Sequence, residues 1–206
     1  MNEFRRNGKL VGSTDKGKIF VLSAPAGTGK TTLVRMLTEE FPQVIQSISY
    51  TSREPRPHER TGVDYHFVAK EKFKEKITSG DFLEHAVVYE DYYGTDQRWV
   101  EERLKQGKHV FLVIDTQGAR QLMGKVPAVF IFVYPPSFEE LKTRLEERKT
   151  ESSQVIEERL SWSRQELEAG KLYQYNIVND DLNIAYQVLR SIVIAEDHSK
   201  ENIYGI

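Results

Sequence analysis

A glycine-containing loop lies between an apolar run and a helical pattern, and it limits the possible folds more than any other segment: Ser23-Ala24-Pro25-Ala26-Gly27-Thr28-Gly29-Lys30-Thr31-Thr32. Strand, tight turn and helix, in that order, are the context that a phosphate-binding loop requires. Backbone N–H groups of such a loop and the positive end of the helix dipole together form an anion site. Lys30 would approach the outer phosphates, and Thr31 would offer its hydroxyl to Mg2+. The loop therefore predicts binding of a nucleoside triphosphate.

One position departs from the usual pattern G-x-x-x-x-G-K-[ST], because Ala24 stands where the first glycine is expected. That position needs a small side chain in a tight turn, and alanine is the smallest alternative. An ordinary strand-to-helix connection is the competing interpretation, and the flanking strand and helix patterns argue against it.

The composition excludes several classes of protein. The 206 residues suit one domain, and 29 basic against 31 acidic residues give no general attraction to nucleic acid or membranes. The chain has no cysteine and no apolar run near the ~20 residues of a membrane span. We therefore expect a cytoplasmic protein with neither nucleic acid nor membrane as partner. Residues 1–17 are expected to form a flexible leader, and residues 197–206 a C-terminal tail.

Short apolar segments alternate with helical patterns along the chain. Strands are expected at residues 18–23, 44–50, 109–115, 129–133 and 176–178, and helices at 30–41, 70–79, 97–106, 117–123, 138–149, 155–169 and 182–195. This alternation predicts an α/β fold, a parallel sheet flanked by helices. Together with the phosphate loop it indicates the P-loop NTPase type. One domain, residues 18–196, would have its core at 18–49, 96–137 and 170–196.

Two segments interrupt the alternation. Residues 50–95 contain Pro55, Pro57, Gly62 and alternating stretches, which predict an inserted, partly antiparallel sub-domain. Residues 138–169 are helical and highly charged. They fit a solvated helical hairpin with i,i+4 ion pairs, or an arginine-bearing lid over a phosphate site. The neighbouring phosphate loop favours the lid.

A second anion site is indicated by Arg53 and Arg56, which lie three residues apart on a proline-rich segment. Arginine binds phosphate oxygens bidentately, although two exposed surface arginines are the alternative. Farther along, Glu84 offers a carboxylate that accepts two adjacent hydrogen bonds. Guanine presents such a pair of donors, N1–H and the 2-amino group, whereas adenine does not.

Taken in order, these motifs resemble the guanylate kinase family of P-loop nucleoside monophosphate kinases. The matching stretches are Ser49…Thr51-Ser52-Arg53-Glu54-Pro55-Arg56, Gly62-Val63-Asp64-Tyr65-His66-Phe67, Phe82-Leu83-Glu84, Tyr92-Tyr93-Gly94-Thr95, Ile114-Asp115-Thr116-Gln117-Gly118-Ala119, Arg144-Leu145…Arg148…Thr150-Glu151 and Ile177-Val178-Asn179-Asp180-Asp181-Leu182. They run from about residue 17 to about residue 195, and the ordered set is far more specific than any one motif.

The resemblance implies transfer of the γ-phosphoryl group of ATP to GMP, and to dGMP, giving GDP and ADP in purine nucleotide metabolism and GMP recycling. It implies Mg2+ as cofactor, with Thr31 as its ligand. The implied ATP site is Ala24, Pro25, Ala26, Gly27, Thr28, Gly29, Lys30, Thr31, Thr32 and Asn179. The implied GMP-binding sub-domain is residues 50–95, and the GMP site is Ser49, Arg53, Arg56, Tyr65, Glu84, Tyr93, Thr95 and Asp115. The implied catalytic residues are Lys30, Arg53, Arg144, Arg148 and Arg159, the last three in a lid of residues 138–169.

Three positions depart from the family pattern: Ala24, Val113 where many relatives carry a second acid, and Lys149 where glycine is usual.

Three other functions remain possible from the sequence. They are a non-catalytic scaffold domain of the same fold, a kinase for another phosphate acceptor, and a domain that binds nucleotide without transfer. The intact Gly27, Gly29, Lys30 and Thr31 argue against the scaffold domain.

Overall fold

The computed structural model describes residues 10–12, 16–88, 90–147 and 153–199. Its centre is a parallel sheet in the order β2-β7-β1-β8-β9. The strands are β1 (Ile19–Ser23), β2 (Val44–Gln46), β7 (His109–Val113), β8 (Ala128–Tyr134) and β9 (Tyr175–Val178). The three inner strands, β7, β1 and β8, are apolar and largely buried, as expected for a sheet covered on both faces. The predicted α/β fold with a helix-flanked parallel sheet is confirmed.

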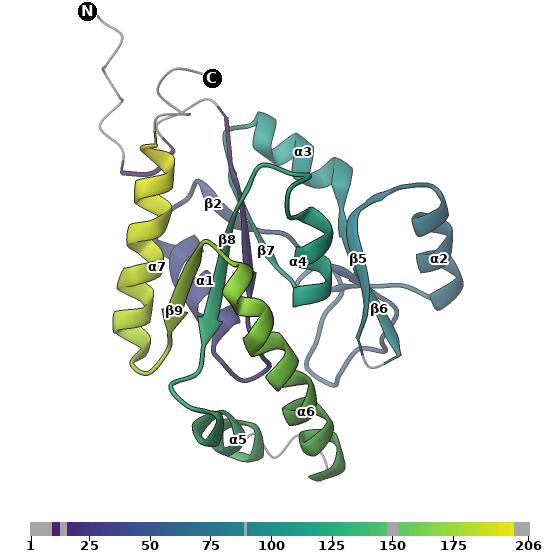
Figure 1. Ribbon diagram of the computed structural model, residues 1–206. Helices are drawn as coiled ribbons and strands as arrows, with labels where there is room; N and C mark the ends of the chain where they lie inside the picture. Colours follow the sequence, from purple (N-terminus) through teal and green to yellow (C-terminus); the bar gives the residue numbers. More distant parts are fainter. Residues whose placement is uncertain (1–9, 13–15, 89, 148–152, 200–206) are drawn as a thin grey trace, which may run out of the picture.

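Helices cover both faces of this sheet (Figure 1). On one face, Phe20 and Leu22 of β1 join a core with α1 (Lys30–Glu40) and α7 (Leu182–Asp197). On the other face, Ile19 and Val21 join a core with α3 (Gln97–Lys105) and α4 (Thr116–Leu122). Successive side chains of a strand point to opposite faces, so one apolar strand serves both cores.

A second, mixed sheet has the strand order β4-β3-β6-β5. It contains β3 (Tyr50–Thr51), β4 (His66–Phe67), β5 (Phe82–Val88) and β6 (Asp91–Asp96). Helix α2 (Lys70–Thr78) buries Phe73 against it, with the Phe73 and Phe82 ring centroids 4.5 Å apart. The prediction of a single strand over residues 44–50 is therefore wrong at its carboxyl end, because β2 ends at Gln46. The apolar pattern continues past Gln46, but Tyr50 already belongs to the second sheet.

Two amide side chains of α4 join the second sheet to the core. Gln121 Nε2 donates to the carbonyl of His85 at 2.6 Å, and its Oε1 accepts from the His85 N–H at 3.3 Å. Gln117 Nε2 donates to the Val87 carbonyl at 3.1 Å. Strand β5 is thus hydrogen-bonded to α4, the helix that begins at the carboxyl end of β7.

Helix α5 (Phe138–Glu147) lies at the edge of the parallel sheet where its strands end, and α6 (Ser153–Ala169) runs from that edge back alongside the sheet (Figure 1). The short 3-10 turn η1 (Gly170–Leu172) follows α6 and precedes β9. The carboxyl edge of a parallel sheet is where ligands bind in open α/β folds. Of the residues expected in the lid, Arg148 and Lys149 lie outside the described part of the chain.

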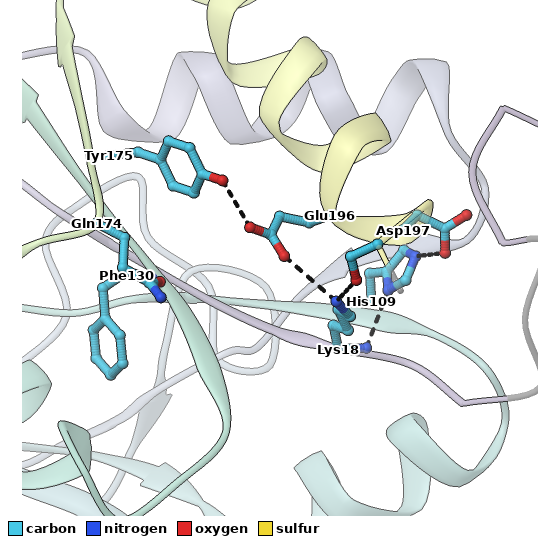
Figure 2. Close-up of polar contacts among 8 residues, drawn as sticks. Lys18, His109, Phe130, Gln174, Tyr175, Glu196 and Asp197 are labelled. Carbon is cyan, nitrogen blue, oxygen red and sulfur yellow. Dashed lines mark hydrogen bonds and ion pairs between the residues drawn. The ribbon is translucent and has the colours of Figure 1, made fainter. Parts of the chain in front are cut away.

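At the opposite, amino edge of the sheet, a polar network joins β1, β7 and α7 (Figure 2). His109 Nδ1 accepts from the backbone N–H of Lys18 at 3.0 Å, and His109 Nε2 lies 2.9 Å from Asp197 Oδ1. Because a backbone N–H can only donate, Nε2 must carry the ring hydrogen and donate to Asp197. Both side chains are fully buried. The network therefore closes the end of α7 onto the sheet.

Two ends of the expected domain are corrected by this packing. Val11, assigned to the leader, is buried in the core with α1 and α7, so described residues of that segment belong to the fold. Asp197, assigned to the tail, ends α7 and is buried against His109. Residues 1–9, 13–15 and 200–206 lie outside the described ranges. Among the helices of the described residues, none has the length and apolar content needed to cross a membrane.

Removing the Asp197 carboxylate is expected to destabilise the protein. In Asp197→Ala the His109 Nε2–H stays buried without that acceptor, which we expect to lower the free energy of unfolding by about 2–4 kcal/mol. Asp197→Asn retains an acceptor oxygen and should lose clearly less. Urea denaturation of the parent and the two variants measures their free energies of unfolding. An equal decrease in both variants would contradict the role assigned to the hydrogen bond.

Candidate active site

The phosphate loop joins β1 to α1 with the backbone geometry that anion binding needs. Gly27 has φ 90° and Gly29, the N-cap of α1, has φ 91°, a region that favours glycine. Thr28 Oγ1 donates to the Pro25 carbonyl at 2.8 Å and closes the turn. Lys30 Nζ donates to the carbonyls of Ala24 at 2.5 Å and Pro25 at 3.1 Å. The lysine ammonium is therefore held over the loop.

Asn179 and α5 brace this loop from outside. Asn179 Nδ2 donates to the Thr28 carbonyl at 2.7 Å, and it lies 2.6 Å from where a Cβ on Gly29 would be. Any side chain at Gly29 would thus displace Asn179. Arg144 of α5 donates from Nη1 to the Asn179 carbonyl at 3.1 Å and from Nε to Glu140 at 2.9 Å. Asn179, expected in the ATP site, is thus hydrogen-bonded to the phosphate loop itself.

A cavity of about 410 Å³ runs from this loop to the second sheet. Ala24, Ala26, Lys30 and Thr31 line its loop end, and Ser49 and Glu84 line the other. Such a volume suits a small ligand. The phosphate loop and the Glu84 carboxylate, both expected from the sequence to bind a ligand, therefore face one cavity.

Glu84 is the most deeply buried carboxylate of the cavity wall, with 4% of its surface exposed. The β5–β6 register places it opposite Thr95, whose hydroxyl donates to Glu84 Oε1 at 2.6 Å. Gly118 of α4 approaches Oε2 so closely that a Cβ there would collide with it. Burial raises the pKa of Glu84 to about 7, although the Thr95 hydrogen bond lowers it.

Arg53, Tyr65 and Tyr93 gather beside the Glu84 end of the cavity. The Arg53 guanidinium carbon lies 5.5 Å from the Tyr65 ring centroid, and the Tyr65 and Tyr93 rings are 5.8 Å apart. Arg53 Nη2 donates to both carboxylate oxygens of Glu59, at 2.8 and 2.9 Å. Partial burial opposes the charge of Arg53, but hydrogen bonds to Glu59 and Tyr93 raise its pKa. Glu59 also accepts from the backbone N–H of Arg56 at 2.8 Å, so one carboxylate organises both arginines.

Asp115 lies between the two ends of the cavity. It is the N-cap of α4, and its Oδ1 accepts from the Gly118 N–H at 2.8 Å. Burial raises its pKa, against the backbone hydrogen bonds and the Lys30 charge, which lower it. The strand expected over residues 109–115 ends at Val113, because the chain turns there into α4.

Helix α6 supplies the remaining wall of the cavity. Trp162, Gln165 and Glu166 line it, with Glu166 near Lys30 and Asp115. Arg159 precedes Glu166 by seven residues, or two helical turns, and shares its side of the helix. Burial raises the pKa of Glu166 to about 7, which the Lys30 charge opposes.

The expected site residues divide into three groups. Those that line the cavity are Ala24, Ala26, Lys30, Thr31, Ser49, Tyr65, Glu84, Tyr93 and Asp115. The other expected residues within the described ranges are not among those that line it; they are Pro25, Gly27, Thr28, Gly29, Thr32, Arg53, Arg56, Thr95, Arg144, Arg159 and Asn179. Arg148 lies outside the described residues.

Two residues of this region were missed from the sequence. Glu59 follows Arg56 by three residues within a turn, closed by its N–H donating to the Arg56 carbonyl at 2.9 Å. Glu166 follows Trp162 and Arg159 at helical spacing, so it shares their face of α6. The turn spacing of Glu59 and the helical spacing of Glu166 place each acid beside an expected site residue. A carboxylate in a charged segment is more often exposed to solvent, so this spacing alone does not identify a site residue.

The oxygen donors around Lys30 fit a magnesium ion that is held largely by a substrate. Thr31, Asp115 and Glu166 line the same cavity. Mg2+ prefers oxygen ligands, keeps several waters, and is usually bound through one or two carboxylates and phosphates. In the described part of the chain, no three His, Cys, Asp or Glu side chains form a protein-only metal cluster.

The parallel sheet, the phosphate loop at its carboxyl edge and the second anion site define an α/β protein of the P-loop nucleotide-binding class. Comparison with known proteins identifies the family within that class. The family model described as guanylate kinase matches residues 16–196, so the chain belongs to the guanylate kinase family. The predicted resemblance is confirmed.

Individual relatives agree along most of the chain. It is 57% identical to the guanylate kinase of Protochlamydia amoebophila over 189 residues, which are 92% of this chain and 96% of that protein. It is 50% identical to the guanylate kinase of Chlamydia felis over 182 residues, 88% and 89% of the two chains. The crystal structure of guanylate kinase from Anaplasma phagocytophilum matches with a TM-score of 0.76 at 30% identity, covering 94% of this chain and 92% of that one.

The buried Glu84 is expected to make the stability of the nucleotide-free protein depend on pH. Its pKa rises from 4.5 to about 7 on folding, so the folded state holds the proton more tightly. Its stabilising contribution is therefore complete below about pH 4.5 and is lost as the pH rises through about 7. Between about pH 5 and about pH 8, the free energy of unfolding of the parent should fall by about 2–3 kcal/mol relative to that of Glu84→Gln.

Urea denaturation at the two pH values measures this difference. Glu101→Gln, which changes an exposed carboxylate of α3, should track the parent at both. If the parent and Glu84→Gln differ in free energy of unfolding by the same amount at both pH values, Glu84 keeps its ordinary pKa.

Proposed function

We propose that this chain transfers the γ-phosphoryl group of ATP to GMP, giving GDP and ADP, and to dGMP, giving dGDP and ADP, in purine nucleotide metabolism. The observation that carries the proposal is one cavity with a phosphate loop at one end and the buried Glu84 at the other. Membership of the guanylate kinase family supports the same activity. We further propose that the enzyme works in the cytoplasm on these small molecules alone.

The donor phosphates bind along the loop from Ala24 to Thr32. Backbone N–H groups and the start of α1 supply the anion site, and Lys30 adds a full charge. Lys30 now bonds the carbonyls of Ala24 and Pro25, so phosphate oxygens replace these acceptors when ATP enters.

The acceptor is recognised at its base and at its phosphate. Glu84 accepts N1–H and the 2-amino group of guanine, Thr95 holds that carboxylate in place, and Ser49 completes the wall. Arg53, Arg56, Tyr65 and Tyr93 bind the phosphate. Because Glu84 is buried, a base without two adjacent donors would leave this carboxylate with the Thr95 hydroxyl as its only hydrogen-bond donor among the described side chains, which is costly.

Phosphoryl transfer depends on positioning and on neutralising charge at the equatorial oxygens. Lys30 and the arginines Arg53, Arg144, Arg148 and Arg159 provide that neutralisation. The acceptor phosphate is largely ionised near neutral pH, since its second pKa is about 6. No residue therefore needs to act as general base, and Asp115 orients groups at the centre of the cavity.

Magnesium is proposed as the cofactor. When bound with ATP it neutralises charge on the outer phosphates. Thr31 would hold it, with Asp115 and Glu166 within the same cavity. Residues 50–95 and the lid at 138–169 are proposed to close over both substrates, because water would otherwise compete as acceptor.

Turnover across a panel of monophosphates tests the proposed function. With ATP and Mg2+, ADP release should be rapid with GMP and at least about 100-fold slower with AMP, CMP or UMP, because only guanine satisfies Glu84. Lys30→Ala, prepared identically, should lose about a thousandfold and thereby exclude a contaminating kinase. Comparable rates with AMP or UMP would contradict the acceptor, and no turnover with any would favour a binding domain.

Arg53→Lys tests the proposed phosphate clamp. Lysine keeps the charge but loses the planar fork that pairs with Glu59 and with phosphate, so KM for GMP should rise about tenfold. KM for ATP should change less than about threefold, since Arg53 lies at the acceptor end. Arg98→Lys, at an exposed position on α3, is the matched control. An equal rise in both KM values would indicate a general loss of folding.

A further inference from the structure

Glu166 is a carboxylate of α6 that faces the donor end of the cavity. It lines the cavity together with Ala26, Lys30 and Thr31. Lys30 and Asp115 are the charged groups that act on it, and the Tyr173 hydroxyl lies close enough to be affected by both carboxylates. Two acids therefore flank one ammonium group beside the phosphate loop.

Nothing in the packing of α6 explains a carboxylate at this position. No hydrogen bond or ion pair among the described residues uses the Glu166 carboxylate, whereas Glu168, two residues on, pairs with Lys171 at 2.5 Å. Burial raises the pKa of Glu166 to about 7, so the charged form is disfavoured where it stands. A half-buried acid without a hydrogen-bonding partner among the described residues, placed in a cleft, is typical of a functional position.

The charge at this point acts against a free triphosphate. The phosphates of ATP carry about four negative charges near neutral pH. Asp115 and Glu166 repel these charges, whereas Lys30 and Arg120 of the same cavity attract them. A divalent cation between the phosphates and the carboxylates reverses the sign of that interaction, because carboxylates bind the waters or the ion of a hydrated magnesium. The same carboxylate therefore opposes metal-free ATP and favours the metal complex.

We propose that Glu166 is a specificity-determining residue, which makes the donor site accept the magnesium complex of a nucleoside triphosphate in preference to the free anion. It acts by repulsion of the unaccompanied phosphates as much as by attraction of the ion. The inference rests on the proposed magnesium–ATP donor. It concerns binding, so it can be tested without turnover.

The test is the ratio of ATP dissociation constants measured by calorimetry with excess EDTA and with excess Mg2+, in the absence of GMP. The parent should bind the magnesium complex more tightly. In Glu166→Gln, metal-free ATP should bind about threefold to tenfold more tightly and magnesium–ATP about threefold more weakly, so the ratio falls at least about tenfold. A purely structural role would move both constants in the same direction.

Two further variants sharpen the outcome. Glu168→Gln removes the same charge from an exposed site on the same helix, and it should leave the ratio at the parent value. Glu166→Asp keeps the charge and should retain most of the preference. A parent ratio preserved in Glu166→Gln would overturn the role of Glu166 alone. Equal affinities with and without metal in the parent would overturn the proposed cofactor as well.

Discussion

The hydrogen bond from the Asn179 amide to the Thr28 carbonyl is the interaction on which the rest of the site depends. It holds the loop at Gly29, where there is room for no side chain. The backbone N–H of Asn179 donates to Tyr134 at the end of β8, and its carbonyl accepts from Arg144 of α5. One residue thus joins the phosphate loop, the sheet edge and the base of the proposed lid. Because these contacts are buried and close-packed, the three parts hold one another in register.

The sequence predicted best those features whose cause is local. The loop from Ala24 to Thr32 is contiguous, and the strand before it and the helix after it are recognisable from their own patterns. The boundary at Tyr50 was missed because an apolar pattern does not reveal that a strand has changed sheets. Glu59 and Glu166 were missed for a different reason. Their partners, Arg53 in one case and Lys30 with Asp115 in the other, are brought to them only by tertiary folding, so neither spacing nor composition distinguishes them from solvated acids.

The charge distribution of the cavity is unusual for a site that binds two anions. Three carboxylates, those of Glu84, Asp115 and Glu166, line it together with Lys30. Burial raises the pKa of all three, so none is placed where its charged form is most stable. Glu84 has a hydroxyl partner and Asp115 caps a helix, which accounts for their fixed positions. Negative groups among anion sites reject phosphates that arrive in the wrong place, and selectivity built on repulsion needs such groups.

The two edges of the parallel sheet differ in how their buried polar groups are paired, and this difference distinguishes groups that stabilise the fold from groups that bind ligands. At the amino edge, His109 and Asp197 are as deeply buried as any residue of the core, and the two ring nitrogens of His109 are paired (Figure 2). At the carboxyl edge, burial raises the pKa of the acids instead, and Glu166 has no hydrogen bond among the described residues. The same fold is thus able to satisfy buried polar groups where only stability matters. Its failure to do so at one edge indicates that ligands complete the interactions there.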